Sequence, residues 1–85
     1  MNYGIVKVDM SMAKEEPQRL FRIFKEMEFL PLRAEAMLCS DVIKYEGWCP
    51  MFRNLEHGAV IPTYLLEITC RQSGDLKSVT VQEQT

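Results

Sequence analysis

The chain has 85 residues, 47% of them hydrophobic and 26% charged, and a formal net charge of -2. This length supports one hydrophobic core and a single domain over residues 1–85, and the composition excludes a disordered chain. The slightly acidic balance argues against nonspecific binding to phosphate backbones. No charge-free stretch approaches the about 20 residues of a membrane span, and the N-terminus lacks the pattern of a signal peptide, so we expect a cytoplasmic protein.

The first two predicted elements are a strand and an amphipathic helix. Asn2 to Asp9 is rich in β-branched residues with apolar side chains on both parities, which favours a central position in a sheet. The helix runs from Glu16 to Glu28, with Pro17 in its first turn. Pro31 is expected to end the helix, because its ring disfavours helical geometry at the residue before it. The apolar stripe of this helix comprises Leu20, Phe21, Ile23, Phe24 and Met27.

Three further strands are predicted after the helix. Ala34 to Glu46 fits one long strand or two strands joined by a bulge near Ser40-Asp41, and we favour one bent strand. Thr63 to Arg71 has the clearest alternation in the chain, and Leu76 to Gln82 returns after a turn. Glu83 to Thr85 is expected to fray.

Together these elements predict an α+β fold, a two-layer sandwich with one helix packed on a mainly antiparallel four-stranded sheet, in the order β-α-β-β-β. The last three strands are expected to form an antiparallel meander. A single core of this size supplies little stability without a disulfide, a metal or a second subunit, which makes a homodimer a standing hypothesis. The odd number of widely spaced cysteines, three in all, indicates reduced thiols.

The connection from Gly47 to Gly58 carries more large apolar side chains than a connection needs. Aromatic residues, methionine and arginine are the types enriched in protein interfaces. The predicted partner-binding residues are Trp48, Met51, Phe52, Arg53 and Leu55. The same segment is equally compatible with a lid folded back onto the core, and the sequence leaves both alternatives open.

Nucleic-acid binding is the second hypothesis. Basic side chains lie on the predicted helix and just beyond it, at Arg19, Arg22, Lys25 and Arg33. Against this hypothesis, Glu26 shares the helix face, and the predicted strands lack the exposed aromatic residues of RNA-reading sheets.

No residues form a recognisable catalytic or metal-binding motif. Cys39, Cys49, His57 and Cys70 lack the closely spaced pairs typical of structural zinc sites. Cys49 and His57 could form a nucleophilic pair, but no helix N-terminus follows Cys49 to lower its pKa. The carboxylates offer no stacked pair and the glycines no phosphate-binding motif.

We therefore predict a small non-catalytic protein-interaction module with no metal and no cofactor. It would serve as an accessory, inhibitor or regulatory protein and act through a hydrophobic loop or a sheet edge. A nucleic-acid-binding regulator is the alternative, and a cysteine- or metal-dependent enzyme comes third.

Overall fold

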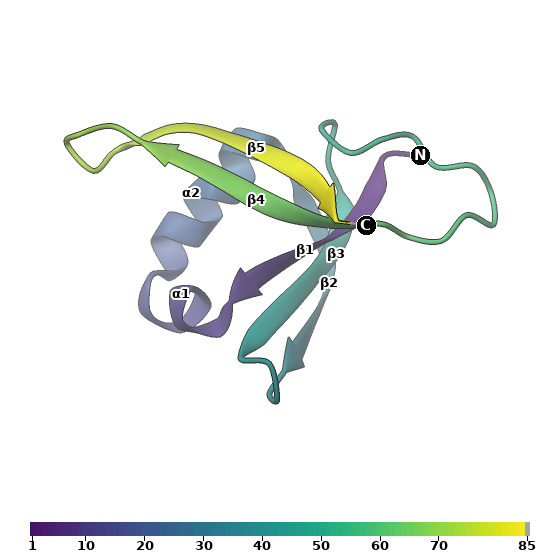
Figure 1. Ribbon diagram of the computed structural model, residues 1–85, viewed down its shortest axis with the longest axis horizontal. Coiled ribbons are helices and arrows are strands. Elements are labelled where there is room, and N and C mark those ends of the chain that lie inside the picture. The colour runs from purple at the N-terminus through teal and green to yellow at the C-terminus, as the bar shows by residue number, and fades with distance from the viewer. Residues whose placement is uncertain (85) are drawn as a thin grey trace.

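The computed structural model describes residues 1–84. The chain forms a five-stranded mixed sheet in the order β2-β3-β1-β4-β5, with two short helices (Figure 1). All neighbouring strands are antiparallel except β1 and β4, which are parallel. The elements are β1 (Tyr3–Asp9), α1 (Met10–Glu15), α2 (Pro17–Met27), β2 (Leu30–Met37), β3 (Val42–Trp48), β4 (Thr63–Cys70) and β5 (Leu76–Gln84).

The predicted four-stranded antiparallel sheet with one packed helix is wrong. The segment from Ala34 to Glu46 is not one bent strand but belongs to the hairpin of β2 and β3. Ser40 and Asp41 lie in the hairpin turn, where the Ser40 N–H donates to the Met37 carbonyl at 3.1 Å and Asp41 has a φ of 55°. The structure has a second helix, α1, between β1 and α2, where the sequence predicted a single helix.

The predicted meander is also wrong, because β1 lies between β3 and β4. Its central position agrees with the apolar residues on both of its parities. Val6 and Val8 are buried on the side covered by α2, while Tyr3 and Ile5 are half-buried on the open face of the sheet. The strand pairs with β3 along its whole length, from Tyr3↔Trp48 to Asp9↔Val42.

Helix α2 closely matches the predicted helix but ends at Met27 through a backbone motif rather than at Pro31. Glu28 adopts a left-handed conformation with a φ of 59°. Its N–H bonds to the Lys25 carbonyl at 3.1 Å, and the Phe29 N–H bonds to the Phe24 carbonyl at 2.9 Å. The rings of Phe24 and Phe29 meet edge to face with centroids 4.9 Å apart. This is a Schellman motif with its usual apolar contact, and it turns the chain directly into β2.

The core lies between α2 and one face of the sheet. β1 and β4 pair only at Ile5↔Thr63 and Val6↔Tyr64, after which the β4–β5 hairpin curves away over α2 (Figure 1). Phe21, predicted in the apolar stripe, is instead 70% exposed. The buried cluster comprises Val6, Val8, Leu20, Ile23, Phe24, Met27, Phe29, Cys49, Phe52, Tyr64 and Val79.

The C-terminal strand is longer than predicted. β5 continues through Glu83 and Gln84, which were expected to fray, while Thr85 lies outside the described residues. Over residues 1–84, neither helix has the length and apolar character needed to cross a membrane.

Candidate protein-binding site

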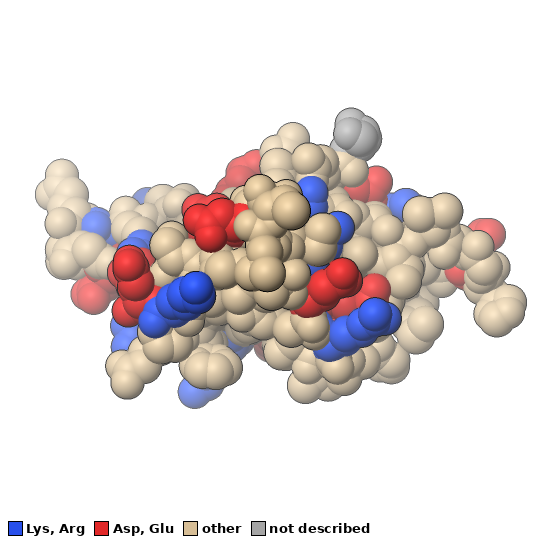
Figure 2. Space-filling model, turned by 90° about the horizontal axis from the view of Figure 1, so that it is seen from below, with Lys and Arg blue, Asp and Glu red and all other residues tan. Residues whose placement is uncertain are grey.

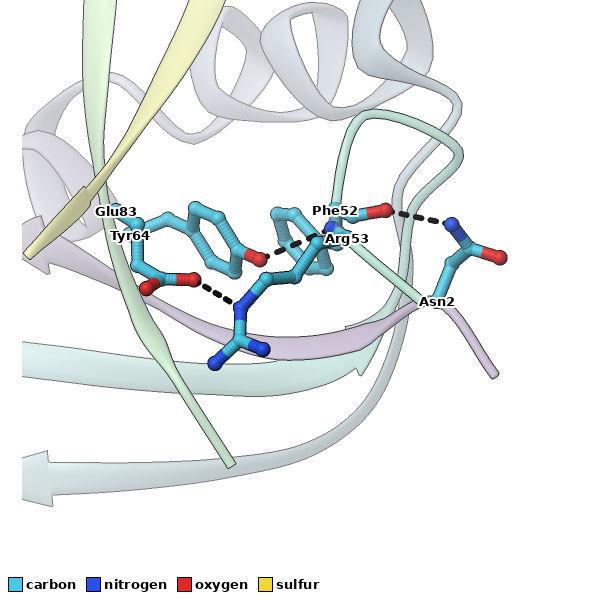
Figure 3. Close-up of polar contacts among 5 residues, drawn as sticks. All are labelled: Asn2, Phe52, Arg53, Tyr64 and Glu83. Atoms are coloured by element: carbon cyan, nitrogen blue, oxygen red, sulfur yellow. Dashed lines mark hydrogen bonds and ion pairs between the residues drawn. The ribbon is translucent and has the colours of Figure 1, made fainter. Parts of the chain in front are cut away.

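The segment that follows β3 is held against the start of β1. The Cys49 N–H donates to the Asn2 carbonyl at 3.1 Å, and the Leu55 N–H donates to the Met1 carbonyl at 2.8 Å. The Asn2 side-chain amide donates to the Phe52 carbonyl (Figure 3). These hydrogen bonds satisfy backbone donors and acceptors at both ends of the segment. They hold its backbone in place and so fix the positions from which its side chains project.

Phe52 is part of the core. Its side chain is 2% exposed and stacks on Tyr64, with ring centroids 4.3 Å apart and an interplanar angle of 6°. Phe29 contacts it from another side, at a centroid distance of 5.8 Å. Phe52 therefore acts as the lid that the sequence left open as an alternative.

Arg53 connects this segment to the last strand. Its backbone N–H donates to the Tyr64 hydroxyl at 3.0 Å, and its guanidinium forms an ion pair with Glu83 of β5 (Figure 3). The hydrogen bond to the Glu83 carboxylate raises the pKa of Arg53. Leu55 is half-buried. Through these contacts Arg53 holds the segment against β4 and β5. An exposed ion pair of this kind contributes little to stability.

Trp48 and Met51 point outward instead, with exposed fractions of 49% and 42%. Trp48, the last residue of β3, lines an apolar groove of about 550 Å³, which we call the Trp48 groove. Leu30 at the start of β2 also lines it and is 59% exposed. The complete lining comprises Met1, Asn2, Glu28, Leu30, Trp48, Cys49 and Pro50.

The sequence did not identify Leu30 or Glu28 as part of this surface. They come together because the Schellman turn at Glu28 sends the chain back beside the end of β3, where Leu30 pairs with Trp48. A local signal was present in the Leu30-Pro31-Leu32 run, which is too apolar for a connecting segment. Only the register of β2 on β3 shows that it lies beside the tryptophan.

Cys49 lies at the inner wall of the groove as a structural thiol. The side chain is 1% exposed and its Sγ donates to the Met27 carbonyl at 3.2 Å. Burial raises the pKa of the Cys49 thiol, which favours the neutral, unreactive form. His57 is exposed in the loop. Within residues 1–84, no three side chains among His, Cys, Asp and Glu gather as a metal site would require.

The raised pKa predicts a pH dependence of stability. In the folded state the Cys49 pKa lies above its unfolded value, so ionisation favours the unfolded state and stability falls as the pH rises beyond about 8.5. A Cys49→Ser variant keeps a donor for the Met27 carbonyl and should lose this part of the decline. Urea unfolding at a series of pH values measures the effect. Cys39→Ser, at an exposed cysteine, should behave like the wild type, and superimposable profiles for all three proteins would contradict the prediction.

The basic residues proposed for nucleic-acid binding do not form one surface. Arg19 is paired with Glu16 at 3.4 Å, and Arg22 and Lys25 share their face of α2 with Glu26. Arg33 lies on the open face of the sheet, opposite the side covered by α2, in register with Glu46 of β3. On the face shown in Figure 2, basic and acidic side chains are interspersed.

Comparison with protein-family models, with curated proteins and with solved structures finds no match for this chain.

Proposed function

We propose that this chain is a small non-catalytic protein-interaction module that binds a protein partner through the Trp48 groove. The observation that supports this proposal is the groove itself, with large apolar side chains about half exposed around a concave surface. Exposed apolar surfaces of this kind on small proteins are typical of interaction sites, and tryptophan is the residue type most enriched among their energetic hot spots. Three unpaired thiols support a reducing compartment, and we place the module in the cytoplasm.

The lining of the groove also indicates the chemistry of the partner. Glu28 is the only charged side chain of the lining, and the other contributions are mainly apolar. A partner segment that inserts an apolar side chain beside Trp48 and places a lysine or arginine near Glu28 complements both features. A module that binds such a segment would serve as an accessory, inhibitor or regulatory protein. The nucleic-acid alternative has no comparable surface in its favour, because Arg33 is separated from the cations of α2 by the sheet.

The proposal predicts that truncating the exposed residues abolishes binding and preserves the fold. Trp48→Ala combined with Leu30→Ala, two exposed residues of the groove lining, should weaken partner binding by about 30-fold or more, as expected for loss of a hot spot of about 2 kcal/mol. Affinity capture from the native cell, compared quantitatively between wild type and variant, measures this loss. Trp48 is the only tryptophan, so its fluorescence reports directly on burial when the captured partner is added back.

Val60→Ala provides a matched control, because Val60 is 87% exposed and does not line the groove. This variant should retain every partner of the wild type. Circular dichroism and thermal unfolding should be the same for all three proteins within the small range of surface substitutions. A partner that binds the double variant as tightly as the wild type, and that leaves the Trp48 fluorescence of the wild type unchanged, would refute the proposal.

A further inference from the structure

The free edge of β2 is a second surface with a specific complement. Within the described residues β2 is an outermost strand, paired with β3 on one side only. Its residues from Leu30 to Ala36 are all exposed. An edge strand of this kind presents unpaired N–H and C=O groups and can pair with a further strand.

The hydrogen bonds of the sheet show which residues present these groups. The Cys49 N–H points to β1, where it bonds to the Asn2 carbonyl. Because backbone direction alternates along a strand, even-numbered residues of β3 direct their N–H and C=O groups to β2. The backbone N–H and C=O groups of Arg33 and Glu35 therefore point to β3, where Glu46 and Lys44 lie opposite them. The groups of Ala34, between them, and of Ala36, the next residue, are directed outward, away from β3.

The side chains beside these outward groups are self-complementary. In an antiparallel pair of two β2 strands with Ala34 opposite Ala34 of a second copy, Arg33 lies opposite Glu35 of that copy, and Glu35 opposite its Arg33. Both Ala34 residues direct their backbone groups outward and can exchange two hydrogen bonds, so the neighbouring Arg33–Glu35 pairs occupy the positions at which opposite side chains approach most closely. The same register places Leu32, which is 59% exposed, opposite Ala36 of the second copy.

Other symmetric registers are disfavoured by charge. Moving the two-fold axis to position 33 or 35 places Arg33 opposite Arg33 or Glu35 opposite Glu35, and like charges directly opposite one another are destabilising. The axis at position 36 forms no charge pair. The other outer strand, β5, is less suited, because its Glu83 already pairs with Arg53 and α2 contacts the strand.

We propose that two copies of this chain associate through an antiparallel pairing of their β2 strands, centred on Ala34, to form one continuous sheet. This inference goes beyond the proposed function and does not use the Trp48 groove. The partner of the β2 edge is a second copy of the same chain, because Arg33 and Glu35 of one copy complement Glu35 and Arg33 of the other.

A charge-exchange experiment tests the register. Arg33→Glu places carboxylates at both positions, and Glu35→Arg places cations at both. Each variant alone should therefore show at least a tenfold rise in the dimer dissociation constant, since every altered pair occurs twice in a symmetric dimer. An equimolar mixture restores opposite charges at both positions and should recover a heterodimer. Sedimentation velocity over a concentration series measures all three samples.

Two further variants separate this inference from its competitors. Ala34→Pro removes an outward N–H that β3 does not use, so it should abolish the dimer while circular dichroism still shows the folded chain. Ser78→Glu, on β5, should leave the dimer intact. A wild-type chain that stays monomeric throughout the series overturns the inference, as does a dimer weakened by Ser78→Glu but not by the β2 variants, or a folded mixture that does not associate. Trp48→Ala should dimerise like the wild type, so failure of the groove proposal gives a different result.

Discussion

Replacing Gly47 with alanine is expected to destabilise the protein by about 3 kcal/mol, and to prevent folding if the total stability is low. A Cβ at this position would lie 2.1 Å from the Leu30 carbonyl oxygen and 2.9 Å from the Pro31 Cα. These are backbone atoms of β2 at its bulge between Pro31 and Arg33. They can move aside only if the pairing of β2 with β3 opens. Urea unfolding followed by circular dichroism measures the loss.

Two other glycines calibrate this effect. Gly58→Ala meets nothing within 4 Å, but its φ of 84° is left-handed, so a cost of about 1 kcal/mol from backbone strain is expected. Gly4→Ala meets the side chains of Tyr64 at 2.7 Å and Phe52 at 3.0 Å, which can shift in part. We expect its cost to lie between the other two. Equal stabilities of the Gly47 and Gly58 variants would contradict the close approach of β2 to Gly47.

The close approach at Gly47 lies in the β2–β3 hairpin, the part of the fold that could not be predicted from the sequence. Periodicity is a local property, so the ranges of β1, α2, β4 and β5 could be predicted closely from alternation and helical spacing. The β2–β3 hairpin could not, because its turn begins with Leu38 and Cys39 and places Asp41 in the left-handed conformation. Glu28 similarly occupies a position where glycine is the usual signal of a helix end.

Strand order depends on contacts that are distant in sequence. Apolar residues on both parities indicated that β1 is central, and it is. The pattern did not specify the neighbours of β1. β3 and β4 each have mainly apolar side chains at alternate positions, so either strand could lie beside β1. The long connection from 49 to 62 allows β4 to lie beside β1 instead of β3. This single choice converts an antiparallel meander into a mixed sheet.

The sequence singled out the segment that carries the candidate site, but it did not show which of its aromatic residues is buried and which is exposed. Trp48 and Phe52 are both large, aromatic and close in sequence, so composition alone does not distinguish which of them is buried in the core. Tyr64 decides between them, because its ring lies flat against Phe52 and its hydroxyl accepts the Arg53 N–H. That contact joins the connection to β4 across most of its length, and no local pattern reports it.

Phe52→Ala should therefore have a large effect on stability, a loss of about 3 to 5 kcal/mol of unfolding free energy. The substitution leaves a cavity under the loop and removes the stacking on Tyr64, a contact worth about 1 kcal/mol beyond its area. Such a loss is a large share of the 5 to 15 kcal/mol or so that typical domains possess. Urea unfolding measures it directly, and Phe52→Leu, which fills most of the volume, should recover a large part of the lost stability.

Trp48→Ala is the matched comparison, because it removes a larger aromatic side chain that is half exposed. Its effect on stability should be much smaller, since little of the removed surface is buried against the core. The reverse order, with Trp48→Ala the more destabilising, would place Trp48 under the loop and Phe52 in water. The expected order also governs how binding data are interpreted. Loss of binding by Phe52→Ala reports a collapsed loop, whereas loss of binding by a fully folded Trp48→Ala variant reports a contact with the partner.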